Sequence, residues 1–259
     1  MSGLADELAT ARLHGATITV TESQRPVDNA TAYALQQAVA RQLGPASIAW
    51  KVGSTSAEAQ ARLGTTEPGA ARVPRRFLFG SGAAVPVFGT HDLWVEGEFA
   101  LRLGTDLPPR AAAYTREEVE AAVDGVAPAL EIVGSRLQEG LAGAGRLMVT
   151  ADGGANVALV VGPVIEAWRQ FDLPEHPLQL LRNDAVVASG SGARALGDPV
   201  NVMLWLANHQ RQRDGLKAGA IVSTGTCTGL VRVEPGDILK GAFGAVGDVD
   251  ARLLDAEAV

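Results

Sequence analysis

The sequence predicts an α+β protein in which a helical N-terminal segment precedes a larger, strand-rich domain. Leu35, Val39 and Leu43 recur at four-residue spacing, as they do on one face of a helix. Toward the C-terminus, short apolar runs alternate with glycines, and the chain has 30 glycines in all, which is typical of tight turns between strands. We therefore expect a helical segment over residues 1–45 and one mixed β domain over residues 46–259.

The first elements follow from local signals. The predicted helix over residues 32–43 ends at Gly44 and Pro45, a pair that stops helices. Residues 47–53 then form an apolar run rich in strand-favouring side chains. The stretch over residues 64–90 is rich in glycine and proline, and we expect a long loop there.

Two later helices are predicted by the residues at their starts. Thr115 and Glu118 have the spacing of a capping box, and the helix that follows is expected to end near Gly125. Asp198 followed by Pro199 gives an N-cap and then a proline at the first helical position.

Composition excludes several classes of protein. The chain is 47% hydrophobic and 20% charged, unlike a disordered chain. Its net charge of -7 argues against general nucleic-acid binding. No run reaches the ~20 apolar residues of a membrane span, and the first residues lack the pattern of a signal peptide. A single cysteine, Cys227, excludes a disulfide framework and a cysteine-rich zinc site. A cytoplasmic enzyme without nucleic-acid or membrane partners is the expectation.

Two glutamates, Glu96 and Glu98, stand one residue apart in the apolar run over residues 94–101. Side chains two apart in a strand point to the same face, so the carboxylates are expected to lie side by side. They cannot both stay ionised at low cost unless a cation, a shared proton or an Arg or Lys accompanies them. A hard divalent metal satisfies this need because it takes oxygen ligands. The alternative is a half-exposed strand whose outer face carries glutamates.

Three further features carry chemistry. Glu131 is the lone charge in an apolar run over residues 128–133, and charged residues are almost never fully buried unless paired. Lys51 also lies in an apolar run. It either reaches solvent at a sheet edge or faces inward, where it can bind a substrate carboxylate or transfer a proton. The turn over residues 224–229 is rich in hydroxyls and backbone donors that can hold a carboxylate.

Eight segments occur together in the order and spacing of one enzyme family. They are residues 33–37, 50–56, 63–68, 95–100, 128–136, 152–156, 205–207 and 224–229. In these segments, which extend over nearly the whole chain, the sequence resembles the 2-keto-4-pentenoate hydratases of the fumarylacetoacetate hydrolase superfamily.

The resemblance implies a mixed β-sandwich roll, a divalent metal (Mg²⁺ or Mn²⁺), and a homo-oligomer. It assigns a role to each of several residues. The metal carboxylates would be Glu96, Glu98 and Glu131, the active-site lysine Lys51, and the other substrate-binding residues Thr226 and Asp152.

The chain departs from the family pattern at one position that bears on catalysis. Many hydratases have an aspartate directly after the proline of the Leu-Gly-x-x-x-Pro motif, where it helps to move protons; here that position is Gly69. Glu67, two residues earlier, is the candidate to take over this catalytic role. The usual Asp-Asn-x-Ser turn is also altered over residues 152–155.

The implied activity is a hydro-lyase reaction on a small 2-oxo acid. Water would add to a 2-hydroxy-2,4-dienoate, or its 2-oxo-4-enoate form, to give a 4-hydroxy-2-oxo acid, as in the meta-cleavage catabolism of aromatic compounds. The alternatives are a metal-dependent decarboxylase of 2-oxo-3-enedioates, a C–C hydrolase of acylpyruvates, and an altered member that binds a keto acid without turnover. The substrate's tail is open: a second carboxylate would need another cation, for which the sequence offers Arg75, Arg76, Arg136 and Arg194.

Overall fold

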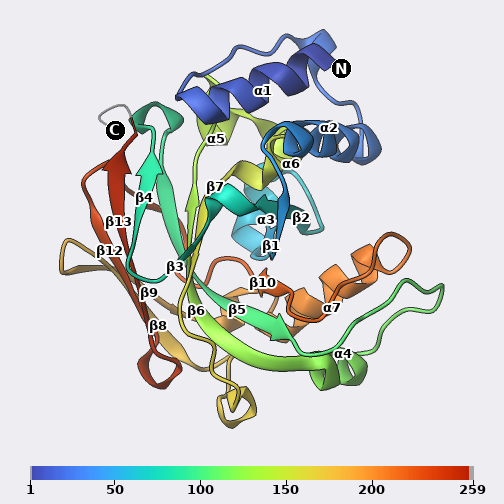
Figure 1. Ribbon diagram of the computed structural model, residues 1–259, viewed down its shortest axis with the longest axis vertical. Helices are drawn as coiled ribbons and strands as arrows, with labels where there is room; N and C mark the ends of the chain where they lie inside the picture. The colour runs from blue at the N-terminus through green and yellow to red at the C-terminus, as the bar shows by residue number, and fades with distance from the viewer. Residues whose placement is uncertain (1, 257–259) are drawn as a thin grey trace.

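Two β-sheets form the centre of the structure, a computed structural model that describes residues 2–256 (Figure 1). The first sheet contains β1 (Ala46–Gly53), β2 (Gly69–Pro74), β3 (Leu78–Gly80), β5 (Trp94–Leu103), β6 (Val123–Val133), β7 (Asn156–Val161), β10 (Ile221–Ser223) and β11 (Val231–Arg232). The second contains β4 (Ala83–Val87), β8 (Pro177–Arg182), β9 (Ala185–Ser191), β12 (Ile238–Ala242) and β13 (Asp248–Asp255).

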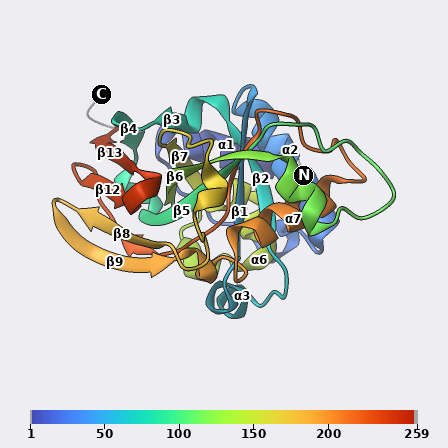
Figure 2. The ribbon, with the colours of Figure 1, turned by 90° about the horizontal axis from the view of Figure 1, so that it is seen from below.

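The helices lie around these sheets. They are α1 (Ser2–His14), α2 (Asn29–Gln42), α3 (Ala57–Leu63), α4 (Arg116–Ala122), α5 (Gly140–Gly143), α6 (Gly145–Ala151) and α7 (Pro199–Gln210). Figure 2 shows the second sheet at one side of the molecule and α2 and α7 at the other. The architecture confirms the predicted α+β class. Among the described residues, no helix has the length and apolar character that crossing a membrane requires.

The strand order brings distant segments together at the middle of the first sheet. Its order is β2-β1-β10-β5-β6-β7-β3, with β11 also paired to β5. β5 and β6 are antiparallel and form a long curved ribbon (Figure 1). β6 is buried along almost its whole length, which is why it reads as a continuous apolar run. A charged side chain in the middle of β6 is therefore held in apolar surroundings.

The N-terminal helices pack against α6, which lies beside them in Figure 1. Leu35 and Val39 of α2 are buried in one apolar cluster with Leu8 of α1 and Met148 of α6. The apolar stripe predicted for this helix therefore faces other helices. The expected division near residue 45 falls between α2 and β1; a division into separate units stays a prediction.

Two expectations about element bounds are wrong. Residues 64–90 were expected to be a loop, yet they contain β2, β3 and β4. Each of these strands is at the edge of its sheet, where proline and glycine are tolerated because one side of the strand needs no ladder partner. The helix after Thr115 ends at Ala122 and not near Gly125, because the apolar strand β6 begins at once.

The helix starts at Thr115 and Asp198 are confirmed. The Thr115 hydroxyl accepts a hydrogen bond from the backbone N–H of Glu118, whose carboxylate accepts one from the N–H of Thr115. Asp198 caps α7 by accepting from the N–H of Val200 at 2.8 Å.

We expect Thr115→Ala to lower the free energy of unfolding by about 1 kcal/mol, because it leaves a helix N–H without its acceptor. Urea unfolding followed by circular dichroism measures the loss. Thr105→Ala, at an exposed loop threonine, is the matched control and is expected to change stability much less. Equal effects of the two substitutions would contradict the role of the cap.

Candidate metal centre and active-site cavity

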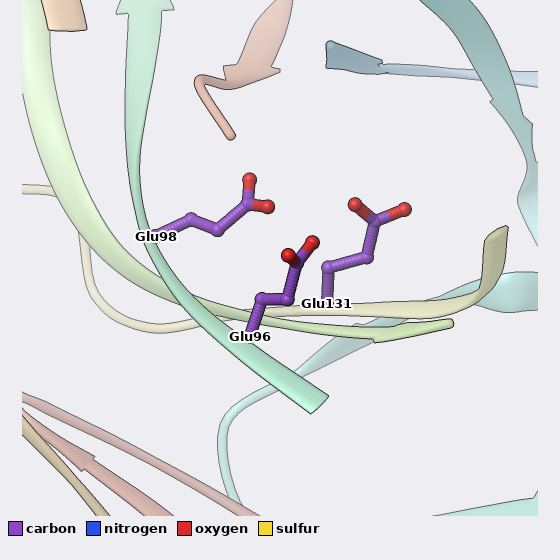
Figure 3. A group of neighbouring side chains, drawn as sticks. All are labelled: Glu96, Glu98 and Glu131. Carbon is purple, nitrogen blue, oxygen red and sulfur yellow. The ribbon is translucent and has the colours of Figure 1, made fainter. Parts of the chain in front are cut away.

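Three carboxylates converge above the β5–β6 ribbon. Glu96 and Glu98 project from β5 and Glu131 from β6, all toward the same side (Figure 3). The register places Glu96 directly opposite Glu131. One oxygen from each residue lies within 4.8 Å of the others. The period of two in β5 and the pairing with β6 are thus enough to build the cluster.

Each of the two fully buried carboxylates has one oxygen held by hydrogen bonds and one oxygen without a hydrogen-bond partner. Oε2 of Glu98 accepts hydrogen bonds from the Ser223 hydroxyl and from the N–H of Gly225, the latter at 2.9 Å. Oε1 of Glu131 accepts from Nδ2 of Asn156 at 2.9 Å. The other oxygens, Glu98 Oε1 and Glu131 Oε2, are buried without a hydrogen-bond partner. Buried polar atoms in this state are costly and call for a ligand.

The electrostatics of the cluster lead to the same conclusion. Burial raises the pKa of Glu96 to about 7, with the charge of Glu131 adding to the effect and Lys51 and Thr226 opposing it. Burial also raises the pKa of Glu98 well above its ordinary value, and both neighbouring glutamates reinforce this. The three side chains therefore cannot all be ionised cheaply without a cation among them.

The donor set fits a hard divalent metal ion. Mg²⁺ and Mn²⁺ prefer oxygen ligands, and carboxylates supply them. One oxygen of each glutamate lies within 4.8 Å of the others, and two buried oxygens of the cluster lack a hydrogen-bond partner, so the cluster can accept such an ion. Glu96, Glu98 and Glu131 would hold it.

Lys51 faces inward beside the cluster. Its Nζ lies 3.3 Å from Oε2 of Glu131 and donates to the carbonyl of Gly154 at 2.8 Å. The residue is only 4% exposed, so it does not reach solvent at a sheet edge. β1 brings it here because β1 pairs with β10, which in turn pairs with β5. A buried ammonium in this position can bind an anion or exchange a proton with one.

A cavity of about 100 Å³ opens onto Lys51 and Glu96. Its apolar wall includes Leu63, Val133, Leu141, Val149 and Leu230. Its polar wall includes Ser54, Gln36, Arg62 and Arg146. A small acid in this space would be largely removed from water, which strengthens each charge interaction made with it.

Thr226 and Asp152 occupy different positions relative to the carboxylates. The Thr226 hydroxyl lies close enough to Glu96 to lower its pKa, and it accepts from the N–H of Gly229 at 2.7 Å. Asp152 is buried and bound by Arg136, whose Nη2 lies 2.7 Å from Oδ2 and whose Nε donates to Oδ1 at 3.0 Å. Substrate contact by either residue stays a prediction.

Glu67 lies outside the cavity. Its side chain is exposed, and its Oε1 accepts from Nδ2 of Asn29 at 3.1 Å. It faces a separate surface depression with Trp205 and His209. The structure does not bring Glu67 to the carboxylate cluster, and its catalytic role stays a prediction.

Several residues that shape the site were not singled out from the sequence. Ser223, Gly225 and Asn156 fix the carboxylates, but polar residues at strand ends resemble ordinary turn residues. Arg146 lines the cavity from the start of α6. The sequence points to it only indirectly, through Gly69, because the guanidinium of Arg146 lies where a side chain at position 69 would be.

The fold and this site define a protein of the fumarylacetoacetate hydrolase type. The sequence model of the family described as "Fumarylacetoacetate (FAA) hydrolase C-terminal" matches residues 38–254. The chain therefore belongs to this family.

Named relatives include hydratases. A 2-keto-4-pentenoate hydratase from Paraburkholderia xenovorans (strain LB400) is 34% identical over 222 residues, which cover 84% of this chain and 81% of that protein. A 2-hydroxypent-2,4-dienoate hydratase from Pseudomonas putida is 32% identical over 213 residues, covering 79% of this chain and 93% of the relative.

A similar solved structure is 4-oxalocrotonate decarboxylase from Pseudomonas putida G7, complexed with magnesium and adipate. It has a TM-score of 0.87 and 27% identity, and the match covers 98% of this chain and 97% of that one. The same decarboxylase complexed with calcium and acetate has a TM-score of 0.85.

We expect Mg²⁺ to raise the melting temperature more at pH 8 than at pH 6. The folded protein without metal holds protons on Glu96 and Glu98 that the unfolded chain releases above its ordinary pKa of about 4.5. Stability from these groups is therefore lost as the pH rises through about 7. A bound cation would replace the protons and restore it.

Differential scanning fluorimetry with EDTA or Mg²⁺ at both pH values measures this difference. Glu98→Gln is expected to reduce the Mg²⁺ shift at pH 8 and to flatten the pH dependence of the metal-free protein. A Mg²⁺ shift as large at pH 6 as at pH 8 would contradict the assignment.

Asp152→Ala is expected to lower the free energy of unfolding by about 3 to 5 kcal/mol, because it leaves the Arg136 guanidinium buried without its carboxylate. Urea unfolding measures the loss. Asp248→Ala removes the exposed ion pair with Lys240 and is expected to cost much less. A stable Asp152→Ala protein would show that the buried pair contributes little.

Proposed function

We propose that this protein is a divalent-metal-dependent hydratase. It adds water to a 2-hydroxy-2,4-dienoate, or the 2-oxo-4-enoate formed from it, and gives a 4-hydroxy-2-oxo acid. The observation that carries the proposal is the cluster of Glu96, Glu98 and Glu131, in which two buried oxygens lack a hydrogen-bond partner and one of them, Oε2 of Glu131, lies 3.3 Å from Nζ of Lys51. Relatives named as 2-keto-4-pentenoate hydratases support the reaction class.

Mg²⁺ or Mn²⁺ held by the three glutamates would supply a Lewis acid that stabilises negative charge on the substrate's 2-oxygen. The residues of the chain do the remaining work. Ser223, Gly225 and Asn156 keep the glutamate side chains in place. The apolar wall of the cavity limits bulk water around the diene.

Lys51 is the proposed proton carrier and carboxylate ligand. Its Nζ is held by one carbonyl and one carboxylate at the base of the cavity, where it can bind the substrate's carboxylate. From there it can also exchange a proton with a substrate carbon during ketonisation. General acid–base groups of this kind typically contribute about 10²–10⁴-fold to a rate. Thr226 and Asp152 are proposed to support binding, the first beside Glu96 and the second through Arg136.

A decarboxylase of 2-oxo-3-enedioates is the second candidate. The solved 4-oxalocrotonate decarboxylase resembles this chain over almost its full length. The two reactions share stabilisation of an enolate and differ in whether CO₂ leaves or water adds. A C–C hydrolase is less well supported, because no histidine is among the described residues that line the cavity.

We also infer a cytoplasmic homo-oligomer that serves in aromatic catabolism. The named relatives are hydratases of the proposed reaction class, which is the support for this setting. The only cysteine, Cys227, is free and buried, in keeping with a reducing compartment. Exposed Val186 and Val187 on the sheet-edge strand β9 support association with another subunit.

Purified, metal-stripped protein is mixed with 2-hydroxypenta-2,4-dienoate, and loss of its ultraviolet absorbance is followed with and without Mg²⁺ or Mn²⁺. We expect metal-dependent loss and a product heavier by one water in mass spectrometry. Glu98→Gln and Lys51→Met are expected to lower kcat/KM by at least about 100-fold.

Glu22→Gln, at a side chain that is 96% exposed, is the matched control and should retain activity. Glu67→Gln tests the residue that lies outside the cavity. Release of CO₂ from a 2-oxo-3-enedioate, without hydration of any dienoate, would establish the decarboxylase instead. Metal binding without turnover of either substrate would identify an altered family member.

A further inference from the structure

Arg146 occupies the space that a side chain at position 69 would need. Gly69 carries no side chain, and a Cβ atom built on it would lie 2.5 Å from Nη1 of Arg146 and 2.7 Å from Nη2. The guanidinium of α6 thus lies directly against β2 at this point. Because position 69 is a glycine, the cavity wall presents the positive group of Arg146 at this point.

Not all N–H groups of the Arg146 guanidinium have a hydrogen-bond acceptor in the protein. Nη2 donates to the carbonyl of Pro68 at 2.6 Å, and Nη1 reaches the Ser54 hydroxyl only at 3.5 Å. Nε is buried and has no hydrogen-bond partner. Among residues 2–256, no carboxylate forms a salt bridge with Arg146. A partly buried guanidinium without an anion is costly, and the cost falls when an anion binds.

The other arginines that could bind a second carboxylate of the substrate either pair with a carboxylate of the protein or do not line the cavity. Arg136 binds Asp152, and Arg194 pairs with Glu58 at 3.1 Å. Arg75 and Arg76 do not line the cavity. Arg62 does line it, but its side chain is 47% exposed and pairs with Glu58 at 3.0 Å.

Lys51 and Arg146 flank the same cross-strand pair of glycines. Gly53 and Gly69 are opposite one another in the β1–β2 register. A Cβ on Gly53 would lie 3.0 Å from Nζ of Lys51, just as one on Gly69 would contact Arg146. Because Cβ positions of paired residues are about 5 Å apart, the two cations lie within about 10 Å of each other. This separation suits the two ends of a short diacid.

We propose that Arg146 binds a second carboxylate at the distal end of the substrate, so that the preferred substrate is a short 2-hydroxy-2,4-dienedioate or its 2-oxo form. The proposal rests on the hydratase function above and names its substrate class. The planar guanidinium presents parallel N–H groups that match a carboxylate. Arginine stays protonated and cannot serve as a base, so Arg146 acts on specificity and not as a proton carrier.

The first test measures binding without turnover. Isothermal titration calorimetry in saturating Mg²⁺ compares two saturated analogues, 2-oxohexanedioate and 2-oxopentanoate, which differ in the distal carboxylate. The wild-type protein should bind the diacid more tightly. Arg146→Gln should weaken diacid binding by about 10- to 100-fold, the range for a lost charge-assisted contact, and monoacid binding far less.

Four further variants locate the effect. Arg146→Lys keeps the charge and should retain part of the diacid preference. Gly69→Asp places a carboxylate against the flexible end of Arg146 and should abolish the preference by pairing with it. Arg62→Gln and Arg75→Gln remove other positive charges and should preserve the preference. Circular dichroism checks the folding of each protein; if Arg146→Gln fails to fold, Arg146→Lys and Gly69→Asp decide the question.

The outcomes separate this proposal from the hydratase function. Tighter monoacid than diacid binding in the wild type, equal losses for both analogues in Arg146→Gln, or loss of the preference in Arg62→Gln would overturn it. Hydration of a dienoate by a protein whose diacid binding does not depend on Arg146 would leave the hydratase function standing and this proposal refuted. Arg146-dependent diacid binding in a protein that hydrates no dienoate or dienedioate would do the reverse.

Discussion

The repulsion among three neighbouring carboxylates, two of them fully buried, is the constraint on which the rest of this structure depends. The β5–β6 register forces Glu96 and Glu131 together, and the alternation of β5 adds Glu98. The carboxylates of Glu98 and Glu131, which are fully buried, cannot turn toward solvent from the middle of the sheet. The neighbouring strands supply groups that stabilise these carboxylates: Ser223 comes from β10, Lys51 from β1, and Asn156 from the start of β7. These donors hold some of the carboxylate oxygens, and two buried oxygens without a hydrogen-bond partner are left to a cation.

Charged residues behind Asn156 hold this amide in the position from which it contacts Glu131. Arg12 of α1 donates to Oδ1 of Asn156 at 2.9 Å. This contact turns Nδ2 of the same amide toward Glu131. Arg136 donates to the Asn156 carbonyl and is itself neutralised by Asp152. The N-terminal helix is therefore part of the site's support, although it contributes no residue to the cavity. Outer partners of this kind commonly change metal affinity by about 10- to 100-fold.

The sequence was informative where a charge interrupts an apolar pattern. Glu96, Glu98, Glu131 and Lys51 stand out because a strand buried on both faces has no other reason to contain them. Sheet edges were misjudged over residues 64–90, because glycine and proline there look like a loop until the partner strand is known. Arg146 was invisible for a different reason: it is an ordinary surface type at a helix start, and only the tertiary fold sets it against Gly69.

The pairing of β1 with β10 determines when, during synthesis and folding, the carboxylate site is completed. Lys51 and Ser223 are direct neighbours across these parallel strands, yet they come from opposite ends of the polypeptide. Contacts of such high sequence separation form late, since a long loop must close first. On the ribosome, Lys51 and the glutamates of β5 and β6 emerge long before the Ser223 hydroxyl that accompanies them. Cation affinity can therefore appear only once nearly the whole chain has been made, and metal uptake would report completed folding.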